Sequence, residues 1–109
     1  MSTRREDELF ADDILGAVAR IESYLTGVEE DAFFDSHLLQ DAVIRQLEVI
    51  GEAARRLSPA FRDARPVIPW RDVIGMSAKL SHDYLTVDLR AVWDTATRDI
   101  YHLREQLTR

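Results

Sequence analysis

The longest regular apolar pattern of this chain lies in HLLQDAVIRQLEVIGEAARRLSP, residues 37–59. Apolar side chains recur there at steps of three or four residues: Leu39, Val43, Leu47, Ile50, Ala54 and Leu57. This spacing places them on one face of an α-helix and leaves polar residues for the other faces. Ser36 is a suitable N-cap and Pro59 cannot continue the helix, so we expect a long amphipathic helix between these two residues.

Upstream of this helix, residues 6–26 show the same spacing. The apolar positions are Leu9, Phe10, Ile14, Ala17, Val18, Ile21, Tyr24 and Leu25. The pattern predicts an amphipathic helix that stops at Gly27, because glycine commonly ends helices. A short turn or helical piece is expected at residues 31–34.

Downstream, residues 58–69 include three prolines and several charges, so a surface loop is predicted there. Pro69 suits the first turn of a third helix, which should end near residues 84–86. Asp88 is the expected N-cap of a fourth helix. Its apolar stripe runs through Leu89, Val92, Trp93, Ala96, Ile100, Leu103 and Leu107. Four amphipathic helices predict an all-α fold, a four-helix up-down bundle that forms a single domain over residues 1–109.

The helix over residues 37–58 is apolar on more than one face. Leu38, Val49 and Ala53 flank its main stripe. Part of this surface is expected to form an interface between two copies of the chain, so a homodimer is predicted.

The composition, with 46% hydrophobic and 31% charged residues, is that of a globular protein. No apolar stretch of signal or membrane type follows the charged N-terminus, so we expect a cytoplasmic protein with no membrane association. The net charge of −6 argues against a general nucleic-acid binder. Residues 45–79 nevertheless carry a balance of +3. Two interpretations stay open. The arginines of this stretch either form a local basic surface or only solvate a helix end and a loop. The arginines concerned are Arg55, Arg56, Arg62 and Arg65.

Few patterns of catalytic or metal sites occur in the sequence. There is no cysteine, and no pair of histidines four residues apart beside a glutamate, so no metal site is predicted. Glu48 and Glu52 share a helix face and are expected to meet arginines. Ser81, His82 and Asp83 are neighbours on a helix, point in different directions and cannot form a catalytic triad. His82 remains the candidate for proton transfer near neutral pH, although a single histidine near a helix end is more often a capping or packing residue.

Three stretches resemble, in order and spacing, the HepT-like family of HEPN domains: IRQLEVIGEAARRLSP (44–59), IPWRDVIGM (68–76) and LSHDYLTVDLRAVWDT (80–95). The resemblance covers most of the chain. It implies a four-helix bundle that dimerises and carries a motif of an Arg, four arbitrary residues, a His, one residue and a Tyr. His82 and Tyr84 match the His and the Tyr of that motif.

The motif arginine is missing. Its position holds Ser77, and Ala78 follows where family members commonly carry a polar residue such as Asn. A serine hydroxyl brings no positive charge to a phosphate, so the chain resembles a weakened or inactive form of the enzyme. The candidate substitutes for the lost charge, and the candidate contacts to RNA phosphates, are Lys79, Arg45 and Arg71.

The resemblance also implies a mechanism without metal or cofactor. Positions 77 and 82 lie ~140° apart around an ideal helix, so they are not neighbours on one face. In the family, the motifs of two subunits line a shared cleft that receives RNA. His82 would transfer a proton while the ribose 2′-hydroxyl attacks the adjacent phosphate, leaving a cyclic phosphate.

The implied biological role is that of a toxin in a toxin–antitoxin pair. The partner would be an MNT-type nucleotidyltransferase antitoxin, which transfers AMP from ATP to the hydroxyl of Tyr84. An alternative is a non-catalytic helical module that dimerises and binds such a nucleotidyltransferase. Ser77 is the feature that keeps this alternative open.

Overall fold

The structure, a computed structural model, describes residues 3–75 and 87–108. Every regular element within these ranges is a helix, which confirms the predicted all-α class. The elements are α1 (Arg4–Leu25), α2 (Glu30–Phe34), α3 (His37–Arg56), α4 (Pro59–Asp63), a helix over residues 70–75, α6 (Leu89–Asp94), η2 (Thr95–Asp99) and α7 (Ile100–Leu107). None of the helices in the described ranges is long and apolar enough to cross a membrane.

The ends of α1 and the start of α3 follow local sequence signals. Thr3 and Glu6 form a capping box, in which each backbone N–H donates to the side chain of the other residue. After α1, Gly27 adopts a φ of 73°, the left-handed conformation that glycine tolerates best. Ser36 caps α3 by accepting a hydrogen bond from Leu39 N at 3.1 Å. The expected first helix, the short piece before Ser36 and the long second helix are therefore confirmed.

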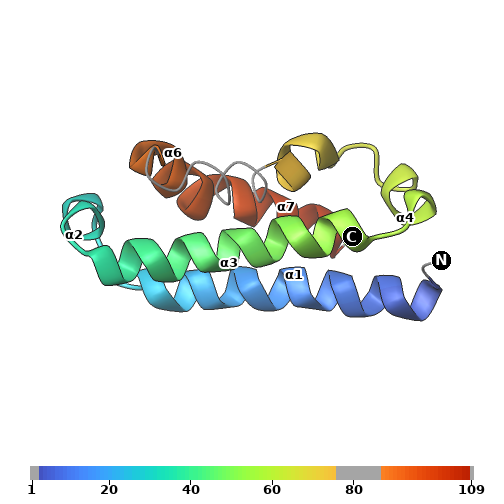
Figure 1. Cartoon of the computed structure of the whole chain (residues 1–109), viewed down its shortest axis with the longest axis horizontal. Helices are drawn as coiled ribbons and strands as arrows, with labels where there is room; N and C mark the ends of the chain where they lie inside the picture. The colour runs from blue at the N-terminus through green and yellow to red at the C-terminus, as the bar shows by residue number, and fades with distance from the viewer. Residues whose placement is uncertain (1–2, 76–86, 109) are drawn as a thin grey trace.

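The long helices lie side by side with their axes roughly aligned (Figure 1). α1 and α3 pack together in opposite directions, and the C-terminal rod, defined as α6, η2 and α7, runs in the same direction as α3. Their apolar faces meet in one core. Its largest fully buried side chains are Phe33, Ile14, Ile21, Leu47, Ile50, Leu57, Ile100, Val18 and Val43. Each such side chain contributes roughly 1.5–3 kcal/mol when it leaves water, so this shared face is the main support of the fold.

The prediction of a surface loop over residues 58–69 is wrong in two respects. The segment begins with the helix α4, in which Ser58 accepts a hydrogen bond from Phe61 N at 3.1 Å and Pro59 occupies the first turn. It also enters the core, because Ile68 is only 3% exposed. A serine cap followed by proline favours a helical turn, and this local signal outweighs the later prolines.

The fourth helix begins as predicted but is not a uniform α-helix. The Asp88 side chain accepts hydrogen bonds from Arg90 N at 3.0 Å and Ala91 N at 3.2 Å. In the middle of the rod, η2 forms a π-helical turn. The Thr97 hydroxyl donates to the Trp93 carbonyl at 2.7 Å beside this turn. A sequence stripe with steps of three and four does not reveal one widened turn.

Leu9 of the predicted first stripe lies outside the core, and so does Leu38, which was expected to flank the stripe of the second helix. Leu9 of α1 is 57% exposed and Leu38 of α3 is 80% exposed. Ala53, which was expected to flank the stripe of α3, is buried within the chain and offers no surface to a second copy. Leu38 and the half-buried Val49 remain as apolar surface of α3.

Candidate functional site

The predicted catalytic and modification residues follow directly after the helix over residues 70–75. Ser77, Ala78, Lys79, His82 and Tyr84 all lie outside the described residues, so their roles stay predictions. The structure describes the elements on both sides of them. These elements precede and follow residues 76–86 in the chain.

The helix over residues 70–75, which precedes the predicted site residues in the chain, is anchored by Trp70. The indole Nε1 of Trp70 donates to the carbonyl oxygens of Arg62 and Arg65, both at 3.1 Å. The Trp70 ring packs edge to face with Phe61 at a centroid distance of 6.3 Å, and the Arg65 guanidinium lies 3.6 Å from the Phe61 ring centre. These contacts fix the start of the helix against the turn that precedes it.

Val87 and Asp88 follow the predicted site residues in the chain, and Asp88 caps the C-terminal rod. Arg90, in the first turn of the rod, forms an ion pair with Glu30 of α2 and lies 5.3 Å from the Phe34 ring centre. The second turn carries Val92 into the core. The cap and these contacts hold the start of the rod against α2.

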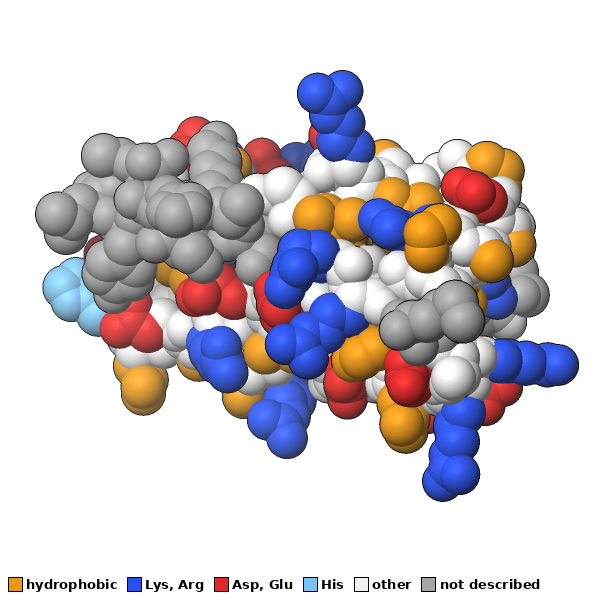
Figure 2. Space-filling view, turned by 45° about the vertical axis from the view of Figure 1, so that its right-hand side comes forward, with side chains coloured by type: hydrophobic (Ala, Val, Ile, Leu, Met, Phe, Trp, Pro, Cys, Tyr) orange, Lys and Arg blue, Asp and Glu red, His pale blue; other side chains and the backbone are white. Residues whose placement is uncertain are grey.

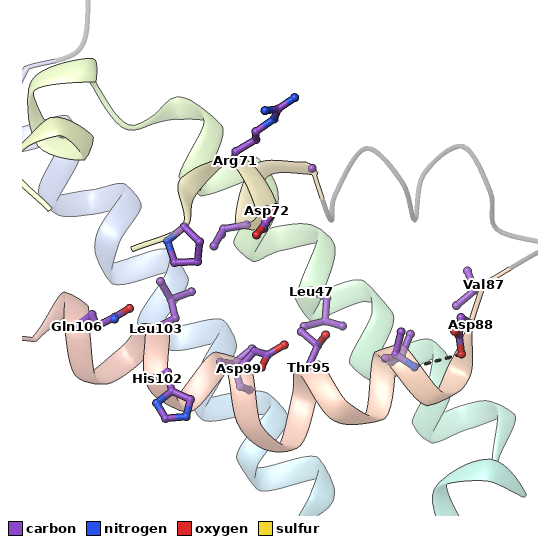
Figure 3. Close-up of a pocket in the computed structure, with 16 residues that line it drawn as sticks. Leu47, Arg71, Asp72, Val87, Asp88, Thr95, Asp99, His102, Leu103 and Gln106 are labelled. Atoms are coloured by element: carbon purple, nitrogen blue, oxygen red, sulfur yellow. Dashed lines mark hydrogen bonds between the residues drawn. The ribbon is translucent and has the colours of Figure 1, made fainter. Parts of the chain in front are cut away.

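A cavity of about 850 Å³ lies between the helix over residues 70–75, α3 and the rod (Figure 3). Its apolar lining includes Leu47 from α3 and Val73 from the neighbouring helix. The rod contributes Val92, Ile100 and Leu103. Its volume falls within the range of roughly 300–1,000 Å³ that is typical of small-ligand sites.

Three of the four side chains around the cavity that are charged at neutral pH are acidic, and the fourth is Arg71. Asp72, Asp88 and Asp99 line it, together with Thr95. Thr95 and Asp99 lie on the face of the rod that is directed toward Leu47 (Figure 3). The Arg71 side chain extends away from the cavity (Figure 3). A carboxylate rim repels phosphate and accepts hydrogen bonds from N–H donors. The cavity is therefore unsuited to a phosphate group.

The cavity is the feature that the sequence did not predict. Thr95, Asp99, His102 and Gln106 recur at steps of three and four and all line it. In a sequence this pattern is typical of the solvated face of a helix. His102 is exposed and lies on the side of α7 away from the helix over residues 70–75 (Figure 3).

Several arginines of the basic stretch have partners within the chain. Arg55 and Arg56 donate to Glu52 at 2.6 Å and 3.1 Å, which confirms that Glu52 meets arginines. These hydrogen bonds, from Arg55 first and then Arg56, lower the pKa of Glu52. Arg65 donates to the Phe61 carbonyl at 3.2 Å. Three of the four arginines in question therefore serve local structure, which favours the solvation interpretation over a general basic surface.

Arg45 and Arg71 are the predicted candidates for RNA contacts that lie among the described residues. Both are exposed, and neither has an ion pair or side-chain hydrogen bond with the described residues. Figure 2 shows Lys and Arg side chains spread among acidic side chains over one face of the molecule. Across the described ranges, no three His, Cys, Asp or Glu side chains converge in a way that could hold a metal ion.

The described helices make the chain an all-α protein. The family model described as "Ribonuclease HepT-like" matches residues 14–109. The chain therefore belongs to the HepT-like ribonuclease family.

Curated relatives carry related descriptions. A protein of Thermococcus cleftensis described as "probable ribonuclease HepT" is 37% identical over 93% of this chain and 92% of its own length. A "gamma-glutamylcyclotransferase and putative RNase" of Methanocaldococcus jannaschii is 38% identical over 95% of this chain, which spans only 47% of that relative. A "putative RNase" of the same organism is 34% identical over 94% of this chain and 85% of its own length. No solved structure matches the chain.

Proposed function

We propose that this protein is the toxin of a HEPN–MNT toxin–antitoxin pair and that its site is built to cleave RNA without a metal. The observation that carries the proposal is the HepT-like family match, together with His82 and Tyr84 at the positions of the family motif. The anchored helix over residues 70–75 and the capped rod support it, because they would hold the motif segment at two defined points.

In the proposed reaction, the ribose 2′-hydroxyl loses its proton and its oxygen bonds to the adjacent phosphorus. The bond from phosphorus to the 5′-oxygen breaks, and that oxygen takes up a proton. The products are a 2′,3′-cyclic phosphate and a 5′-hydroxyl. His82 is the proposed proton-transfer group, because imidazole exchanges protons near neutral pH.

The proposed site lacks the charge that should stabilise the phosphorane-like transition state. An arginine can bind two phosphate oxygens at once, whereas Ser77 offers one neutral hydroxyl. We propose that the natural chain is a weakened or inactive ribonuclease for this reason. Lys79, Arg45 and Arg71 are the cations that could supply part of the missing charge by binding the RNA backbone.

The test compares the chain with Ser77→Arg in a purified RNA-cleavage assay. We expect the substitution to raise cleavage by about 100-fold or more, the scale on which single transition-state donors act. Adding His82→Ala should abolish the gain, whereas Ser77→Lys should recover less because its charge is not bidentate. A folded Ser77→Arg protein that cleaves no faster than the natural chain would refute the ribonuclease proposal.

The second candidate is a non-catalytic module that binds the nucleotidyltransferase, and Ser77 is the observation that favours it. It predicts that Ser77→Arg stays inactive while the chain still binds its partner. The same assay therefore separates the two candidates.

A further inference from the structure

We propose that the cavity between the helix over residues 70–75, α3 and the rod binds one nucleobase of the RNA substrate, with preference for a base that carries an amino group. This inference rests on the proposed ribonuclease function. The proposed ligand is a part of the substrate for which the motif residues have no proposed role.

The position of the cavity relative to the chain supports this assignment. Gly75 and Val87, the described residues that border the segment carrying His82 and Tyr84, both line it. A base bound in the cavity would lie beside both residues that flank this segment in the chain. A base beside the cleaved bond is the part of the substrate that sets sequence preference.

The lining suits a base and excludes the backbone. The half-buried Val73 and Val87 offer apolar surface to a flat ring, whereas Leu47 and Leu103, which also line the cavity, are almost fully buried. The carboxylates of Asp72, Asp88 and Asp99 repel phosphates, so the charged backbone must stay outside. Asp88 already accepts two backbone hydrogen bonds as the cap of the rod.

Asp72 and Asp99 are the acceptors left for a ligand. Their side chains form no hydrogen bond or ion pair with the part of the chain that the structure describes. A carboxylate accepts the amino group of cytosine, adenine or guanine. Uracil has no amino group, and its N3–H donor lies between two carbonyl oxygens that a carboxylate repels, so it should bind less well.

The π-helical turn provides an independent indication. It spans Thr95–Asp99, and both of these end residues line the cavity. Widened turns of this kind occur often at functional sites. Here the turn brings the polar side chains of Thr95 and Asp99 to the cavity. Ala96, inside the turn, and Ile100, directly after it, remain buried in the core.

The experiment measures binding without cleavage. Hexamers of 2′-O-methyl cytidine and 2′-O-methyl uridine cannot be cut, because the 2′-hydroxyl is blocked. Their dissociation constants are compared by fluorescence anisotropy at one salt concentration, for the full chain and for Asp99→Ala. We expect the cytidine probe to bind at least tenfold more tightly than the uridine probe, and Asp99→Ala to reduce this ratio to near one.

The readout is the ratio of the two dissociation constants. Removal of an acidic charge by itself strengthens the binding of both probes alike and so leaves this ratio unchanged. Asp12→Ala is the matched control, since Asp12 is an exposed acid of α1 that does not line the cavity. It should leave the ratio unchanged. Ala91→Phe fills the cavity from the rod and should also lower the ratio, with circular dichroism as a check on the fold.

Equal binding of the two probes by the natural chain, or a ratio that Asp99→Ala leaves intact, would overturn the inference. It would also be overturned if Ala91→Phe dissociated an oligomer without changing the ratio, because the cavity would then be a protein interface. Failure of Ser77→Arg to cleave RNA would refute the ribonuclease function but not base binding, since these probes report binding alone.

Discussion

The carboxylate of Asp7 accepts two hydrogen bonds from Ser58, although 51 residues separate the two in the chain. Ser58 N donates at 2.8 Å and the Ser58 hydroxyl at 2.6 Å. The same hydroxyl oxygen accepts from Phe61 N. Asp7 is 7% exposed, so this contact joins the first turn of α1 to the junction of α3 and α4 in a nearly dry environment.

Replacement of Asp7 or Ser58 by alanine should destabilise the fold by about 1–3 kcal/mol, because the remaining partner is left buried without its hydrogen bonds. The double variant should lose less free energy of unfolding than the two single variants lose together. Urea unfolding curves measure both effects. Asp12→Ala, an exposed control on the same helix, should change the free energy of unfolding by no more than ~0.5 kcal/mol. Equal costs for Asp7→Ala and Asp12→Ala would contradict the finding.

The indole N–H of Trp70 should contribute more to the stability of the fold than the size of its ring. Trp70→Phe keeps an aromatic ring beside Phe61 but leaves the carbonyl oxygens of Arg62 and Arg65 without this donor. We expect a loss of about 1–2 kcal/mol in excess of the packing loss. Trp93→Phe is the matched control, because its indole N–H has no hydrogen-bond partner among the described residues. If the two variants are equally stable in urea, the anchoring role of Trp70 is wrong.

Alkaline pH should destabilise the protein through Tyr101. Burial raises the pKa of Tyr101, and the negative charge of Glu22 raises it further. The neutral phenol is thus favoured in the fold, so its contribution is fully present below the unfolded pKa of about 10 and is lost as the pH rises through the higher folded pKa. Tyr101→Phe should make the urea midpoint less sensitive to pH above about pH 10. If the urea midpoint of Tyr101→Phe depends on pH as that of the natural chain does, Tyr101 is not the source of the alkaline destabilisation.

A homodimer is expected in solution. Multi-angle light scattering should give the mass of two chains at micromolar concentration. Leu38 is the large apolar side chain left exposed at the start of α3, so Leu38→Glu should weaken the dimer more than Leu9→Glu on α1. A mass of one chain for the natural protein would remove the basis for a shared cleft.

AMP transfer to Tyr84 should not depend on the missing arginine. Incubation with the partner nucleotidyltransferase, ATP and magnesium should add units of about 329 Da, the mass of AMP less water, to the intact chain. Tyr84→Phe should remove the added mass and Tyr101→Phe should not. The attached phosphate would exclude RNA by charge and volume near His82. An unmodified natural chain, beside an enzyme that modifies an intact HepT relative, would exclude this regulation.

The helix boundaries were predictable because the signals are local. Ser36, Gly27 and Asp88 act on backbone groups within a few residues of themselves, and the apolar stripe of α3 needs only the helical repeat. The family motif likewise marks His82 and Tyr84 by spacing alone.

Other features depend on which surfaces meet. Nothing in the neighbourhood of Asp7 points to Ser58, since their contact exists only after α1 and α3 pack in opposite directions. Asp99 is an exposed residue that lines a cavity only because the rod packs beside α3 and the helix over residues 70–75. Periodicity specifies which face of a helix is apolar. The partner of each polar group on the other faces is set by packing between segments that are distant in sequence.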